Sequence, residues 1–114
     1  MKDFMLIFIG ANYAELNLSP EEIQGRAGSW MGWQEKMAKQ GIVKEGNALK
    51  ADAKRVVGPQ RTVSDRAATE LKELIGGYYI VKAASFDEAI AIAQDYPDYD
   101  LGGTVEVREV LHYG

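Results

Sequence analysis

The chain begins with a run in which nearly every position is apolar. Over residues 2–9, successive side chains of a strand point to opposite faces. Both faces are apolar, with Phe4, Leu6 and Phe8 on one and Met5, Ile7 and Ile9 on the other. A strand of this kind belongs in the centre of a sheet that is covered on both sides. The pattern therefore predicts a central strand over residues 2–9.

The next periodic stretch predicts a helix over residues 20–40. Ser19 is suited to cap this helix, Pro20 to occupy its first position, and Glu22 to complete a capping box. Gly41 supplies the left-handed residue that ends it. The positions that recur at helical spacing form a wide apolar face, made of Ile23, Ala27, Trp30, Trp33 and Met37.

Two features of this helix are open to more than one interpretation. Trp30 and Trp33 either pack on the sheet as core residues or form an aromatic wall for a ring-shaped ligand. Gly25, Gly28 and Gly32 lower the helix propensity, but their spacing permits another backbone to approach closely.

The middle of the chain alternates between β-prone runs and turn residues. A strand is predicted at 42–51 with a bulge at Gly46-Asn47, and a hairpin around Gly58-Pro59 is predicted at the sheet edge. The other predicted segments are the two hairpin strands at 54–57 and 60–64, an ordered loop at 65–74, and a second central strand at 77–84.

The last part of the chain repeats the order of helix and strand. Ser85 and Glu88 form a second helix-start signal, and Pro97 ends the short helix that follows. Residues 104–111 alternate in the manner of a strand.

Glu106 and Arg108 lie two residues apart in this last strand and therefore project in the same direction. In a strand interior to a sheet, such a charge pair is either a structural ion pair or the polar floor of a site. The sequence leaves both interpretations open.

The order of elements indicates an α+β domain spanning residues 1–114, with two helices on one face of an antiparallel sheet. Two helices can cover only one face, whereas the first strand is apolar on both. A second copy related by two-fold symmetry is the simplest cover for the other face. We therefore expect a homodimer with its sheets packed face to face.

Composition narrows the classes of function. A chain of 114 residues with a formal net charge of −4 is one ordinary domain and is not a nucleic-acid or anionic-membrane binder. It has no cysteine, which excludes disulfides, thiolate catalysis and cysteine-ligated metals and suits a reducing cytoplasm. The apolar run at residues 4–9 is too short to span a bilayer and lacks the flanks of a signal peptide. We expect a cytoplasmic protein.

Charge is unevenly distributed along the chain. Basic residues outnumber acidic ones between Lys44 and Lys72, whereas Arg108 is the only basic residue after Asp87. The basic segment is either a solvated surface or the border of a site for a small anionic molecule.

Several segments together resemble the YCII-related family, and in particular its branch named for an Asp-Gly-Pro-Phe (DGPF) motif. They are the opening KDFMLIFIG, the helix start Ser19-Pro20-Glu21-Glu22, the segment DRAATELKELIGGYYIV, the helix SFDEAIAIA and the closing Val105-Glu106-Val107-Arg108. The chain keeps the motif residues Asp65, Glu70, Lys72, Glu73, Gly76, Gly77 and Tyr78 in register. It has Arg66-Ala67-Ala68 where the branch has Gly-Pro-Phe.

The resemblance implies a ferredoxin-like fold (βαβ-hairpin-βαβ) that forms dimeric α/β barrels, with a cleft between sheet and helices. It also implies a functional link to a sigma-factor system, because some relatives are encoded near or fused to extracytoplasmic-function sigma factors. Another branch of the family is proposed to use a histidine and aspartate pair. The single histidine here, His112, does not occupy that motif position, so this mechanism does not carry over. One histidine and scattered carboxylates show no metal-ligand spacing, and we expect neither a metal nor a cofactor.

Three hypotheses about function follow. The preferred one is a binding or regulatory module for a small anionic metabolite, with a pocket between sheet and helices and with Asp65, Lys72, Glu73, Tyr78 and Arg108 as its ligand-binding residues. The second is an enzyme of isomerase, lyase or hydrolase type. Asp65 or Glu106 would be its base, Arg108 or Lys72 would stabilise negative charge, and Tyr78 or Tyr79 would orient the ligand. The third is a purely structural dimeric module. The first is preferred because no nucleophile–base pair can be assembled from the sequence, although whether the protein is an enzyme stays open.

Overall fold

The structure is a computed structural model that describes residues 1–65 and 74–112. The predicted loop at 65–74 lies almost wholly outside the described residues, and so do Lys72 and Glu73. The elements, in chain order, are β1 (Lys2–Ile9), α1 (Pro20–Lys39), β2 (Val43–Ala48), β3 (Lys54–Val57), β4 (Thr62–Asp65), β5 (Ile75–Ala83), α2 (Phe86–Ala93), the short 3-10 helix η2 (Tyr99–Leu101) and β6 (Thr104–Glu109).

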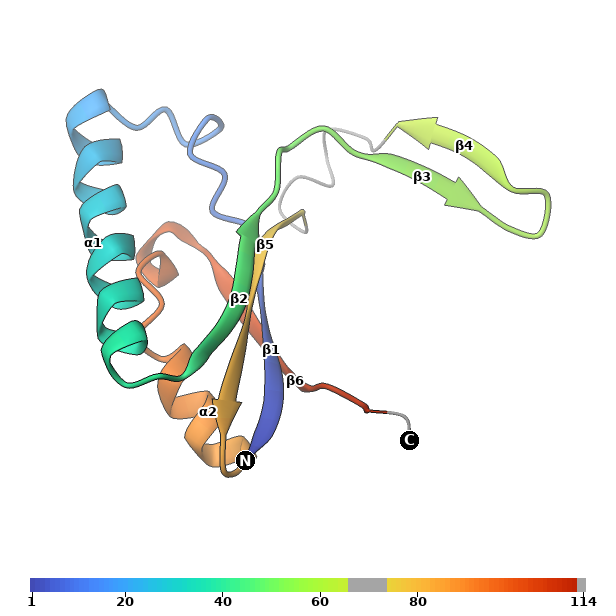
Figure 1. Cartoon of the computed structure of the whole chain (residues 1–114). Coiled ribbons are helices and arrows are strands. Elements are labelled where there is room, and N and C mark those ends of the chain that lie inside the picture. Colours follow the sequence, from blue (N-terminus) through green and yellow to red (C-terminus); the bar gives the residue numbers. More distant parts are fainter. Residues whose placement is uncertain (66–73, 113–114) are drawn as a thin grey trace.

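Four strands form one antiparallel sheet in the order β2-β5-β1-β6. β1 lies in the interior of this sheet between β5 and β6, as its apolar sequence predicted. Both helices cover the same face (Figure 1). The strand order and the two β-α-β connections confirm the predicted α+β, ferredoxin-like fold.

The hydrophobic core lies between this covered face and the helices. Phe4 and Leu6 of β1 and Val81 of β5 have no exposed surface, and Trp33 and Met37 of α1 are also buried. Ala89 and Ala93 of α2 complete the far side of the core.

The other face of the sheet carries no helix (Figure 1), and we call it the open face. Met5 and Ile7 of β1 point to this side and are only half-buried. Met5 pairs with Ile80 and Arg108, and Ile7 pairs with Tyr78 and Glu106, so the open face has an apolar centre with polar neighbours.

The start of α1 follows the predicted capping box. The Ser19 hydroxyl accepts a hydrogen bond from the Glu22 amide, and the Glu22 carboxylate accepts one from the Ser19 amide. The glycines of α1 do not mark a close contact with any other described part of the chain, because a Cβ atom at Gly25, Gly28 or Gly32 would meet nothing within 4 Å there.

The predicted position of the hairpin was wrong. Among the described residues, β3 and β4 pair only with each other and form a separate two-stranded sheet, which projects from the body of the molecule (Figure 1). β2 makes its last pairing with β5 at Ala48 and Gly77, and beyond this point the chain leaves the sheet edge. All positions of the two hairpin strands are exposed, and we call β3, β4 and their turn the projecting hairpin.

Candidate functional site

A cavity of about 570 Å³ lies between α1 and the covered face of the sheet. Its walls come from the ends of β1 and β2, the start of β5, the middle of α1, and the loops after β1 and α2. Five aromatic side chains among the described residues line it, namely Tyr13 and four rings that contact one another, Phe8, Trp30, Tyr79 and Tyr96.

The rings of Phe8, Trp30, Tyr79 and Tyr96 hold one another in place by direct contact. Phe8 stacks on Tyr96, with ring centroids 5.3 Å apart, and meets Trp30 and Tyr79 edge-on at 5.1 and 5.2 Å. Trp33 packs against the same group from the core side, 5.9 Å from Phe8. The sequence left open whether the two tryptophans are core residues or part of a ligand site. Trp33 is a core residue, whereas Trp30 forms part of the wall of the cavity.

Two glycines allow the strands beneath the cavity to approach closely. A Cβ atom at Gly46 would lie 2.0 Å from Cδ1 of Tyr79, and one at Gly77 would lie 2.8 Å from the Asn47 carbonyl oxygen. The bulge that the sequence predicted at Gly46-Asn47 was misplaced, because β2 shifts register against β5 between Val43 and Glu45, whereas Gly46 pairs with Tyr79. The ring of Tyr79 can lie across β2 only because position 46 has no side chain.

A buried polar cluster closes one end of the cavity. Asp98 is only 3% exposed, and its Oδ2 atom accepts hydrogen bonds from the Tyr13 hydroxyl at 2.7 Å and from Trp30 Nε1 at 2.9 Å. Trp30 Nε1 also lies 3.2 Å from the Tyr13 oxygen. Burial, together with the bond to Asp98, raises the pKa of Tyr13 to about 12, so this hydroxyl keeps its proton at neutral pH.

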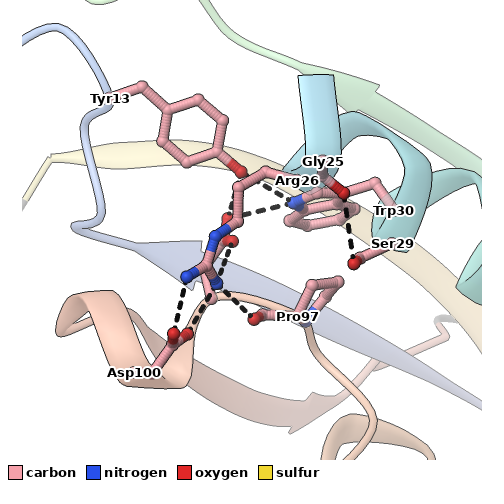
Figure 2. Close-up of polar contacts among 8 residues, drawn as sticks. Tyr13, Gly25, Arg26, Ser29, Trp30, Pro97 and Asp100 are labelled. Atoms are coloured by element: carbon pink, nitrogen blue, oxygen red, sulfur yellow. Dashed lines mark hydrogen bonds and ion pairs between the residues drawn. The ribbon is translucent and has the colours of Figure 1, made fainter. Parts of the chain in front are cut away.

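Arg26 connects this cluster to the loop after α2, as Figure 2 shows. Its guanidinium binds both carboxylate oxygens of Asp100 at 2.6 Å and donates to the Pro97 carbonyl at 3.1 Å. Its Nη1 atom lies 3.5 Å from Asp98 Oδ1. The hydrogen bonds to Arg26 lower the pKa of Asp100, and those to Asp100 raise the pKa of Arg26. We call Tyr13, Arg26, Trp30, Asp98 and Asp100 the Asp98 cluster.

One carboxylate oxygen of this cluster is left without a hydrogen bond. Asp98 Oδ1 is buried and accepts none within the part of the chain that the structure describes. Among the described residues that line the cavity, none is lysine or arginine. The electrostatic character of this end of the cavity is therefore set by a carboxylate.

The residues that the sequence proposed as a site lie elsewhere. Asp65 is an exposed residue of β4 and forms an ion pair with Lys54 across the hairpin. Tyr78, Glu106 and Arg108 lie together on the open face, around Met5 and Ile7.

The structure brings three of the proposed residues to one surface but does not join them through a polar network. Tyr78 accepts a hydrogen bond from Asn47 at 3.0 Å, and neither a hydrogen bond nor an ion pair links the exposed Glu106 and Arg108. Of the described candidates Asp65, Tyr78, Glu106 and Arg108, none lines the cavity. Their roles in a site stay a prediction, and Lys72 and Glu73 lie outside the described residues.

The sequence did not point to the Asp98 cluster and indicated only part of the aromatic wall. Tyr79 was named as a ligand-orienting candidate, and it lines the cavity with its hydroxyl bonded to Gln34. Tyr13 and Asp98 fell in segments that read as loops. The one available signal was the run Tyr96-Pro97-Asp98-Tyr99-Asp100, in which aromatic and acidic residues alternate around a proline.

Two kinds of feature are absent from the described residues. Within residues 1–65 and 74–112, no group of three or more histidine, aspartate or glutamate side chains is placed to hold a metal ion. Over the same ranges, no helix has the length and apolar character needed to cross a membrane.

Comparison with known proteins identifies the family of the chain. None of the curated proteins matches it. The YCII-related domain family matches residues 5–113, which include the cavity walls, the Asp98 cluster and the open face. The segment DRAATELKELIGGYYIV begins at Asp65, and its residues 66–73 lie outside the described residues. Because the match covers nearly the whole sequence, the chain belongs to the YCII-related domain family.

Proposed function

We propose that this protein is a binding module for a small organic molecule, which occupies the cavity between α1 and the sheet. The observation that carries the proposal is the cavity itself, about 570 Å³ in volume and lined by aromatic rings with a buried polar cluster at one end. Small-molecule sites in proteins typically have volumes of about 300–1,000 Å³, mostly apolar walls and a few well-placed polar groups. The cavity has each of these properties.

The state of Tyr13 favours binding over acid–base catalysis. A general base near neutral pH needs a pKa close to the working pH. The pKa of Tyr13 is instead raised to about 12, and its hydroxyl proton is directed at Asp98. This hydroxyl is suited to hold and orient a ligand rather than to accept a proton from it.

The ligand need not be the anion that the sequence suggested. That hypothesis rested on basic residues between Lys44 and Lys72 and on Arg108, whereas the described cavity lining contains no cationic side chain. An anion would be better placed on the open face beside Arg108. The two sites face opposite sides of the sheet, so one experiment can separate them.

The test is a fragment screen followed by two variants. Binding is measured by thermal melts and by the fluorescence of Trp30, which lines the cavity. Ala27→Phe places a large ring in the cavity from an exposed position of α1, whereas Arg108→Ala removes the cation from the open face. We expect Ala27→Phe to abolish fragment binding and Arg108→Ala to leave it unchanged.

The opposite result would overturn the proposal. If Arg108→Ala abolishes binding and Ala27→Phe does not, the ligand site lies on the open face. If no fragment raises the melting temperature or changes the fluorescence of the parent protein, the cavity is not a binding site.

We also propose that two copies pack through the open face and form a dimeric α/β barrel. The half-buried Met5 and Ile7 support this arrangement, because they give the face an apolar centre that the helices leave uncovered. A cytoplasmic location, consistent with the absence of cysteine, and a regulatory link to a sigma-factor system belong to the same proposal.

A further inference from the structure

The geometry of the Asp98 cluster points to an organic cation as the ligand: an amine, an amidine or a protonated heteroaromatic base whose N–H groups face Tyr13 and Asp98. This inference rests on the proposed function, because it assigns the chemical class of the molecule that occupies the cavity. It is carried by the charge of the cluster, the direction of its hydrogen bonds and the aromatic walls beside it.

The charges of the cluster do not balance. Two carboxylates, Asp98 and Asp100, share the single guanidinium of Arg26. Arg26 directs its short bonds to Asp100 and approaches Asp98 Oδ1 only to 3.5 Å. Arg26, the only cation in the cluster, therefore interacts more weakly with Asp98, the buried carboxylate that lines the cavity, than with Asp100.

Three side chains of the cluster line the cavity, Tyr13, Trp30 and Asp98, and their hydrogen bonds leave acceptors, and not donors, available to a ligand. Tyr13 gives its one hydroxyl proton to Asp98, and Trp30 gives its one N–H to Asp98 and to the Tyr13 oxygen. On these three side chains, what remains is the lone pairs of the Tyr13 oxygen and of Asp98, whose Oδ1 atom accepts no hydrogen bond from the described residues. A ligand with N–H groups can bond to them, whereas a carboxylate or phosphate finds no free donor on Tyr13, Trp30 or Asp98, and Arg26 does not line the cavity.

Two residues that line the cavity each donate one amide N–H to a tyrosine hydroxyl. Gln34 donates to the Tyr79 hydroxyl, and Asn47 donates to the Tyr78 hydroxyl. A cation would keep both bonds and gain the attraction of the aromatic rings of the walls.

The experiment uses three probes that share one ring and differ in charge: benzylammonium, benzyl alcohol and benzoate. Titrations of the full chain are followed by calorimetry and by the indole N–H resonance of Trp30 in NMR spectra. We expect benzylammonium to bind at least about ten-fold more tightly than benzoate, with benzyl alcohol between them.

Two variants and a control locate the source of the preference. Asp98→Asn should remove the advantage of benzylammonium over benzyl alcohol, because it keeps the shape of the side chain and removes its charge. Tyr13→Phe should weaken benzylammonium several-fold even if Asp98→Asn fails to fold. Asp95→Asn, at an exposed carboxylate paired with Lys36, should change nothing.

Each outcome decides a different point. Benzoate binding as tightly as benzylammonium, or an undiminished preference in Asp98→Asn or in Tyr13→Phe, would overturn the inference and leave the binding function intact. Benzylammonium that binds without moving the Trp30 resonance lies outside the cavity and would also overturn it. If neither the three probes nor a broad fragment library perturbs Trp30, the proposed function fails together with the inference.

Discussion

Adding a single methyl group at Gly46 tests whether the wall of the cavity is built as described. The Cβ of Gly46→Ala would lie 2.0 Å from Cδ1 and 2.5 Å from Cε1 of Tyr79, so the ring must move. Phe8 on one side, with its ring centroid 5.2 Å away, and Trp33 at 5.5 Å restrict that movement. The substitution also endangers the bond between the Tyr79 hydroxyl and Gln34.

The expected cost follows from two opposing effects. Forcing extra volume into a packed core costs about 1–3 kcal/mol. Replacing glycine by alanine restricts the unfolded chain and returns about 0.4–1 kcal/mol. We expect Gly46→Ala to lower the free energy of unfolding by about 1–2 kcal/mol, which for a small domain shifts the urea midpoint by about 1 M.

Gly28→Ala is the matched control. It makes the same chemical change in the interior of α1, where the new Cβ atom meets nothing within 4 Å. Alanine is a better helix former than glycine by about 1 kcal/mol, so this variant should be more stable than the parent. Urea denaturation followed by far-ultraviolet circular dichroism measures both variants. Equal effects of the two substitutions, or a neutral Gly46→Ala, would show that Tyr79 does not lie across Gly46.

Three other predictions concern the cluster and the open face. Folding raises the pKa of Tyr13 from 10.0 to about 12, so the stabilisation linked to its proton is complete below pH 10 and is lost as the pH rises to 12. The difference in tyrosinate absorbance between the parent and Tyr13→Phe should show a titration near pH 12, and a difference that titrates at pH 10 would contradict this prediction. Arg26→Ala should lower the melting temperature more than Lys36→Ala does, because Arg26 faces a buried carboxylate whereas Lys36 pairs with an exposed one. Equal melting temperatures of the two variants would show that Arg26 does not stabilise the buried Asp98. Light scattering should find a dimer in the parent, burying more than about 1,000 Å² in total, and a monomer for Ile7→Glu, whereas a monomeric parent at high concentration would refute the proposed assembly.

The sequence predicted the elements of the fold with small errors at their ends. β1 has the predicted bounds, and α1 ends one residue before its predicted end at 40. These successes depend on local signals, namely the period of apolar residues and the capping residues around Ser19. Such signals act over a few residues and are therefore visible in the sequence.

The candidate site could not be predicted in the same way because its parts are far apart in the chain. The bond between Tyr13 and Asp98 joins residues 85 positions apart, and the bond between Trp30 and Asp98 spans 68. Neither Tyr13 nor Asp98 lies in a periodic segment that would place its side chain. By contrast, Glu106 and Arg108 are close in sequence and were therefore proposed as a site. They project to the open face, on the side of the sheet opposite to the cavity.

The hairpin was misplaced for a related reason. Its turn residues predicted the pairing of β3 with β4 correctly, since that pairing is local. Whether a hairpin joins a sheet depends on the direction in which the chain leaves the preceding strand. Nothing in the residues after Ala48 specified that direction.

The projecting hairpin divides the molecule into two units that need not unfold together. Within residues 1–65 and 74–112 its strands pair only with each other, and a lone two-stranded hairpin is marginally stable in water. Its amide protons should therefore exchange with solvent through local opening, at rates set by the stability of the hairpin alone. The amide protons of β1 and β5 should exchange only when the whole sheet opens. The same independence makes this segment tolerant of insertion and shortening, so its length and sequence can change in evolution without altering the cavity.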